Sequence, residues 1–117
     1  MSDYLRRQGT RAVVEIPAGT ATTMQVLISA EEAPHFAMRK FTMAPHGGMP
    51  LHTNTVEHEQ YIVSGSAAVT IGEEIFTVTA GDSVYIPANM PHSYQAGADG
   101  FAFICVVPNQ EDKITLV

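Results

Sequence analysis

The sequence contains a single cysteine, few basic residues and no long hydrophobic run, and each shortage excludes a class of protein. Cys105 has no cysteine partner within the chain, which argues against a disulfide-stabilised secreted scaffold. The chain has 6 Lys and Arg against 12 Asp and Glu, and its net charge of −6 disfavours nucleic acids and anionic membranes as partners. The longest apolar run, at 101–107, is far too short to span a bilayer. The N-terminal segment MSDYLRRQGT has no apolar signal region, so we expect a cytoplasmic protein.

The pattern of the remaining residues is typical of one β-rich globular domain. A chain of 117 residues, 45% of them hydrophobic, can bury a single core. Helical periodicity is almost absent, because only residues 29–36 could hold a helical turn and Pro34 cuts it short. Short β-rich runs between Gly and Pro turns predict an antiparallel sandwich or barrel. We expect strands at 11–16, 22–28, 36–43, 59–64, 67–71, 74–78, 82–86, 92–96 and 101–107.

Three histidines adjoin these turns. His52, Asn54, His58 and Gln60 share parity, so an extended backbone projects them toward one face. His92 follows a Pro-x-Asn-x-Pro turn that fixes where it emerges. A lone histidine is more often an ordinary polar side chain on a wet strand face. Three of them beside turns favour a metal site, because neutral imidazoles on adjacent strands can converge on one ion.

The first of these segments resembles a motif of the cupins, which are small jelly-roll β-barrels. The motif has the form G-x5-H-x-H-x3–4-E-x6-G. His52 and Asn54 fall on its His-x-His pair, His58 on its Glu, and Gly65 on its last Gly. His46 stands at the first glycine, which suggests a somewhat different loop there.

The second segment resembles the other cupin motif, G-x5-P-x-G-x2-H-x3-N. Gly81, Pro87 and His92 match it. Asn89 replaces the second glycine, a benign change because Asn tolerates a left-handed backbone. Ala96 stands where the final Asn would be.

The EHE sequence at 57–59 resembles a subgroup of small single-domain cupins in which four histidines hold a manganese-type ion. Members of that subgroup are linked to oxygen-dependent cleavage of alkenes. The resemblance covers roughly residues 36–107 of a single domain, 1–117. It implies an all-β cupin jelly-roll barrel of about ten antiparallel strands and, by analogy alone, a homodimer formed through the N-terminal strands.

The resemblance implies that His52, His58 and His92 are metal ligands. Asn54 replaces the fourth histidine, and three roles stay open: it binds the metal weakly, leaves the position to water, or hydrogen-bonds a turn. Such a donor set suits a divalent transition metal ion such as Mn, Fe, Cu, Ni or Zn, and the sequence does not fix which. His35 and His46 are expected at the surface.

Further candidates come from strand parity and from the same subgroup. Arg39, in an otherwise apolar strand, matches a pocket arginine that could orient an oxygen-bearing substrate; a surface ion pair with Glu57 or Glu59 is the alternative. Cys105 near a metal could be oxidised or tune the site, whereas a buried thiol would be inert. We expect catalytic roles for Arg39, Tyr94 and Cys105, and a substrate pocket formed by Met49, Gln60, Phe103 and Val107, for which plain core packing is the alternative.

These features favour a metal-dependent enzyme that acts on a small organic substrate, with dioxygenase-type oxidative cleavage as the preferred reaction. The alternative is a non-catalytic cupin module that binds a small molecule or a metal, since fold alone does not decide function. A structural role without metal is a weaker third possibility.

Overall fold

A computed structural model of the chain describes residues 4–117. Residues 1–3, part of the segment considered above for a signal sequence, lie outside the described residues. Throughout 4–117 the chain forms strands and turns, and no helix there is long and apolar enough to cross a membrane. The eight strands are β1 Val14–Glu15, β2 Thr20–Ile28, β3 Phe36–Asn54, β4 His58–Ile71, β5 Glu74–Thr79, β6 Ser83–Ile86, β7 His92–Pro108 and β8 Ile114–Leu116.

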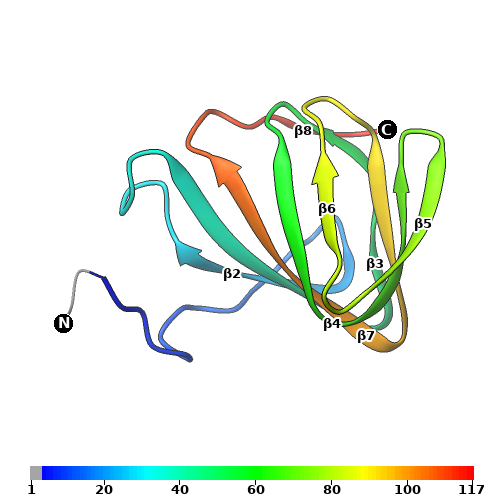
Figure 1. The fold of residues 1–117 in the computed structure, drawn as a ribbon, viewed down its shortest axis with the longest axis horizontal. Coiled ribbons are helices and arrows are strands. Elements are labelled where there is room, and N and C mark those ends of the chain that lie inside the picture. The colour runs from blue at the N-terminus through cyan, green and yellow to red at the C-terminus, as the bar shows by residue number, and fades with distance from the viewer. Residues whose placement is uncertain (1–3) are drawn as a thin grey trace.

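All strand pairs are antiparallel, and the main path runs β1-β2-β3-β7-β4-β5. β6 pairs with the start of β4, at 58–61, and β5 pairs with its end, at 66–71. The long strands β3, β4 and β7 therefore belong to both layers of the barrel. Figure 1 shows them curving around a common interior, with β2 and the N-terminal segment to one side.

The structure has eight strands rather than about ten because expected strands merge. The runs 59–64 and 67–71 form one β4, and 92–96 and 101–107 form one β7. Gly65 lies where β4 bends, between two register shifts against β7. Its φ of +75° lets the strand change direction without ending, because glycine has no Cβ to oppose a left-handed backbone.

Two other expectations change at the edges of the fold. The strand expected at 11–16 shrinks to β1, Val14–Glu15. The segment 29–36 forms no helix; instead Glu32 N donates to Ser29 O at 3.1 Å and closes a turn. No sequence pattern indicated β8, which pairs with β3 beside His52.

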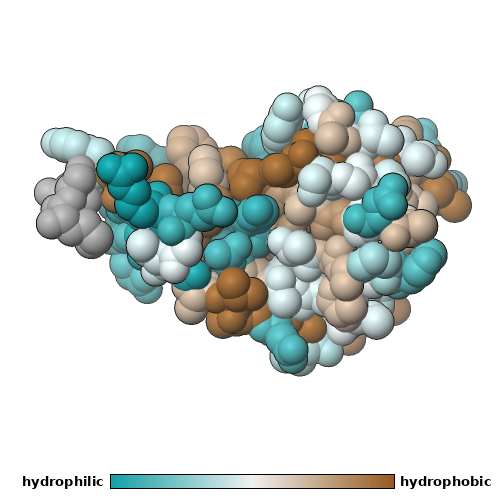
Figure 2. Space-filling model, turned by 90° about the horizontal axis from the view of Figure 1, so that it is seen from below, coloured by the Kyte–Doolittle hydropathy of each residue, from teal (hydrophilic) through white to brown (hydrophobic). Residues whose placement is uncertain are grey.

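The core lies between the two layers and is built from the inward side of each strand. Met43, Ile62 and Ile86 are almost fully buried there. Alternating burial along β4 follows from the two-residue period of a strand. Figure 2 shows one outer face, on which hydrophilic residues gather at the end that carries the N-terminal segment.

Candidate metal centre

Three histidines lie at the ends of neighbouring strands. His52 is near the end of β3, and His58 and His92 are the first residues of β4 and β7. The register of β3 against β7 pairs His52 with His92. Their ring centroids are 4.2 Å apart, and those of His58 and His92 are 6.0 Å apart. All three are buried, so they do not lie on a wet strand face.

The turn that precedes His92 is held against the first histidine segment. Asn89 has a φ of +66°, the left-handed conformation expected of it, and its N–H donates to the carbonyl of Asn54 at 2.7 Å. The N–H of Met90 donates to Pro87 O at 3.2 Å, which closes the turn. The two motifs therefore meet through the backbone as well as through their side chains.

Backbone carbonyls fix the orientation of two imidazoles. His52 Nδ1 lies 2.8 Å from Pro50 O, and His92 Nδ1 lies 2.8 Å from Met90 O. A carbonyl oxygen only accepts, so each Nδ1 must carry a hydrogen, and in the neutral ring the lone pair is then on Nε2. A second hydrogen bond of this kind is what orients metal-bound histidines in proteins.

Burial keeps the rings of His58 and His92 neutral. It lowers the pKa of His58 to about 4, with a further contribution from the charge of Arg39. Burial lowers the pKa of His92 to about 4 as well. At neutral pH both imidazoles are therefore uncharged, which is the form that binds a metal ion.

Several buried atoms with a lone pair that a metal ion could bind have no hydrogen-bond partner among the residues that the structure describes. They are His58 Nε2, His92 Nε2 and Asn54 Oδ1. Buried polar atoms without a partner are rare in native proteins and call for a water or an ion. The donor set of nitrogen and neutral oxygen suits a divalent transition metal. In the described part of the chain no three His, Cys, Asp or Glu side chains are arranged as a complete metal site, so the three histidines stand as candidate ligands.

The Asn54 side chain is tied to the C-terminal segment. Its Nδ2 donates to Asp112 Oδ2 at 2.9 Å, while its Oδ1 has no partner in residues 4–117. The hydrogen bond is to an acidic side chain near β8, rather than to a turn of its own segment. Nothing in the sequence motifs pointed to Asp112, which lies 58 residues away.

A small cavity of about 190 Å³ joins the histidines to most of the other expected site residues. Two expected site residues, Cys105 and Val107, do not line it. Four residues that do line it were not indicated by the sequence: Ile16, Met24, Phe41 and Ile114. A larger hollow of about 890 Å³ between β5 and β6 contains none of the expected residues. We place the candidate site at the smaller cavity, because four residues with a buried polar atom that has no partner in 4–117 line it: Arg39, Asn54, His58 and His92. The expected residues that do line it are Arg39, Met49, His52, Asn54, His58, Gln60, His92, Tyr94 and Phe103.

Arg39 lines this cavity and makes no ion pair with any residue in 4–117. The alternative of a surface pair with Glu57 or Glu59 is therefore wrong. Its guanidinium carbon lies 5.5 Å from the centre of the Phe41 ring, and its Nε is buried without a partner among the described residues. The cation is thus held against an aromatic face and keeps hydrogen-bonding capacity.

Tyr94, Gln60 and Cys105 form a hydrogen-bonded group beside His58. Gln60 Nε2 donates to the Tyr94 hydroxyl at 2.7 Å, and Cys105 Sγ lies 3.4 Å from His58 Nδ1. Burial raises the pKa of Tyr94 above its usual range, so the phenol stays protonated. Burial also raises the pKa of the Cys105 thiol, which favours an inert thiol over a reactive thiolate.

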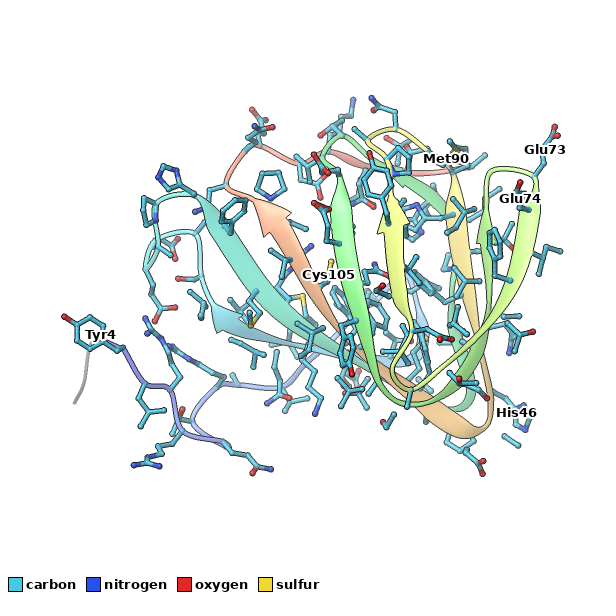
Figure 3. The ribbon with its side chains drawn as sticks, viewed as in Figure 1. Tyr4, His46, Glu73, Glu74, Met90 and Cys105 are labelled. Carbon is cyan, nitrogen blue, oxygen red and sulfur yellow. The ribbon has the colours of Figure 1, made fainter. Side chains whose placement is uncertain are left out.

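The two remaining histidines are exposed, as expected. Figure 3 places His46 at the lower edge of the barrel, away from Cys105 in its interior. His46 has a φ of +62°, the conformation that glycine favours, so its presence at the motif position does not require a different backbone there. His35 lies before β3 and is also exposed.

The Cupin domain family matches residues 39–107, more than half of the chain, and the chain therefore belongs to the cupins. Its structure is similar to that of the polyketide cyclase RemF from Streptomyces resistomycificus. The TM-score is 0.88 at 24% identity, over 97% of this chain and 84% of that one. The expected all-β jelly-roll fold is thereby confirmed.

Part of the chain is similar in sequence to two curated proteins with different names. The chain is 38% identical over 65 residues to acireductone dioxygenase 1 of Pectobacterium atrosepticum, covering 51% of this chain and 38% of that protein. It is 36% identical over 61 residues to mannose-1-phosphate guanylyltransferase of Salmonella muenchen, covering 50% and 13%. The matched part of the chain thus spans well under two thirds of either relative.

Proposed function

We propose that this cupin is a metal-dependent enzyme that acts on a small, largely apolar organic molecule. The observation that carries the proposal is the group of three buried imidazoles in one cavity, two of them oriented by backbone carbonyls. His52, His58 and His92 would hold a divalent transition metal ion such as Mn, Fe, Cu, Ni or Zn. Asn54 is the candidate fourth donor.

The favoured reaction is dioxygenase-type oxidative cleavage. A bound iron, manganese or copper ion supplies redox chemistry with O₂ and Lewis acidity. Cleavage of a terminal alkene by O₂ yields an aldehyde and formaldehyde, with one oxygen atom in each product. The likeness to the four-histidine manganese-type subgroup and to a named dioxygenase supports this choice.

The cavity limits the size of the substrate. A cavity of about 150 Å³ accepts benzene in another protein. The cavity here, at about 190 Å³, therefore suits a molecule with a single aromatic ring and a short substituent. Phe41, Phe103 and Met49 supply apolar walls, and Arg39, which also lines the cavity, would bind a phenolate or carboxylate oxygen. Gln60 and the protonated Tyr94 offer neutral hydrogen bonds.

The second candidate is a cupin module that binds a metal or a small molecule without turnover. The observation that favours the metal-binding form of this module is the cavity volume of about 190 Å³, below the range of about 300–1,000 Å³ usual for ligand pockets, because an ion needs less room than an organic substrate. A homodimer, expected by analogy, stays a prediction that light scattering of the purified protein would test.

The first experiment is elemental analysis of untagged protein, for the wild type and for His58→Ala. We expect about one equivalent of a transition metal in the wild type and its loss in the variant. A wild type that binds no Mn, Fe, Cu or Zn after reconstitution would contradict a metal site.

The second experiment separates the enzyme from the binding module. O₂ consumption and aldehyde formation are followed with 4-vinylphenol, using protein loaded with each metal. Aldehyde formed in a one-to-one ratio to the O₂ consumed, and absent in His58→Ala, would support the enzyme. Ligand binding by isothermal calorimetry without O₂ consumption would favour the module.

A further inference from the structure

The segment before β8 is fastened to the end of β3 by one carboxylate. Asp112 Oδ2 accepts the hydrogen bond from Asn54 Nδ2 at 2.9 Å, and Asp112 Oδ1 accepts one from Thr55 N at 3.0 Å. Lys113 N then donates to Thr55 Oγ1 at 2.8 Å. Pairing of Asn54 with Ile114 continues the contact into β8. The carboxylate is thus held at both oxygens and cannot turn freely.

This fixed carboxylate determines which end of the Asn54 amide faces it. A carboxylate only accepts hydrogen bonds, so the NH₂ group must point to Asp112 and the carbonyl oxygen must point elsewhere. Asn54 is 4% exposed and lines the cavity of the three histidines, and its Oδ1 has no partner in the described residues. The oxygen is therefore available inside a largely apolar cavity, where a bare acceptor is costly.

We propose that Asp112 is a positioning residue that presents the amide oxygen of Asn54 to the metal ion held by the histidines. The inference rests on the proposed metal site and assigns one of the three roles that the sequence left open for Asn54. The last side-chain torsion of Asn is broad and roughly two-fold, so without Asp112 the amide can turn and offer its NH₂ group. An NH₂ group has no lone pair to give and its hydrogens repel a cation. The negative charge of a carboxylate that accepts a hydrogen bond from the amide nitrogen also polarises the amide, which makes its oxygen a stronger metal ligand.

A double-mutant cycle on metal affinity tests the proposal. Metal-free wild type, Asp112→Ala, Asn54→Ala and the double variant are titrated with Co²⁺ alone. Loss of a partner that orients a ligand lowers metal affinity about 10- to 100-fold. We expect that loss in each single variant and no further loss when Asp112→Ala is added to Asn54→Ala. The visible spectrum of the Co²⁺ form should change in the same way in both single variants, because both lose the same donor.

Thr55→Ala is the matched control. It removes the side chain that Asp112 Oδ1 and Lys113 N also contact, but leaves the bond between Asp112 and Asn54. We expect the Co²⁺ affinity and spectrum of this variant to match the wild type. Asn54→Ala alone tests the donor itself, should Asp112→Ala fold poorly by circular dichroism.

The outcomes separate this inference from the proposed function. Wild-type affinity in both Asp112→Ala and Asn54→Ala, with binding lost in His92→Ala, overturns the inference and leaves the histidine site standing. An equal loss from Asp112→Ala in the presence and absence of Asn54, or the same loss in Thr55→Ala, also overturns it. No Co²⁺ binding by the wild type overturns both proposals.

Discussion

Gly65, the last glycine of the first motif, should be among the least replaceable residues of the barrel. A Cβ built there would lie 2.0 Å from the carbonyl oxygen of Gly100, which is backbone and cannot swing aside. The φ of +75° adds about 1–2 kcal/mol for any residue with a Cβ, and forced overpacking typically costs about 1–3 kcal/mol. Gly65→Ala should therefore lower the free energy of unfolding by about 2–5 kcal/mol, measured by urea denaturation.

Gly81, the first glycine of the second motif, provides the control. Its φ is +95°, but a Cβ there would meet no atom within 4 Å. Gly81→Ala should therefore lower the free energy of unfolding only by the cost of a left-handed backbone, about 1–2 kcal/mol. The difference between the two variants isolates the clash with Gly100. Equal losses in the two variants would refute the reasoning that close approach of β4 to β7 requires glycine at 65.

Three further predictions concern the site. The free energy of unfolding of chelator-treated protein, measured with urea, should fall as pH falls from 6.5 toward 4 and stay level above pH 6.5. The reason is that the pKa values of His58 and His92 are lowered in the folded protein, so the unfolded chain takes up protons first. His58→Ala should make this dependence on pH less steep. Arg39→Met should lower the affinity for carboxylate or phenolate ligands about tenfold, measured by calorimetric titration, and leave the affinity for their neutral analogues unchanged. Tyr94→Phe should lower the free energy of unfolding by about 1–3 kcal/mol, measured by thermal unfolding, because it removes the hydroxyl that hydrogen-bonds the buried Gln60 amide; a variant as stable as wild type would contradict this.

The fold was predictable from local signals, and its long strands were not. Strand alternation and Gly or Pro turns identify an antiparallel β-domain, because both depend on neighbouring residues alone. Whether 59–64 and 67–71 are one strand or two depends on the approach of Gly65 to Gly100. That contact between distant segments is invisible in local sequence. The expected count of about ten strands was therefore higher than the eight found.

The site was predictable only where motif residues face the cavity. Parity placed Gln60 and Phe103 on the correct face, and both line the cavity. Parity also suggested Val107, which is buried in the core instead, because strand parity fixes the face and not the height along the barrel. Asp112 and Ile114 reach the site through pairing of β8 with β3, a contact across some 58 residues. A short run such as ITL carries too little pattern to predict that pairing.

The neutrality of the donor set bears on what the cavity can bind. Under the proposed arrangement three imidazoles and one amide surround a divalent ion, so no ligand offsets its charge. The carboxylate of Asp112 acts through the Asn54 amide and also accepts a hydrogen bond from Thr55 N. Arg39 adds a second positive charge to walls that contain no Asp or Glu side chain. Such a cavity favours an anionic oxygen on a small aromatic body over a neutral hydrocarbon, because the anion is attracted by two cations in a medium of low dielectric constant. Substrate screens should therefore begin with phenolates and aromatic carboxylates.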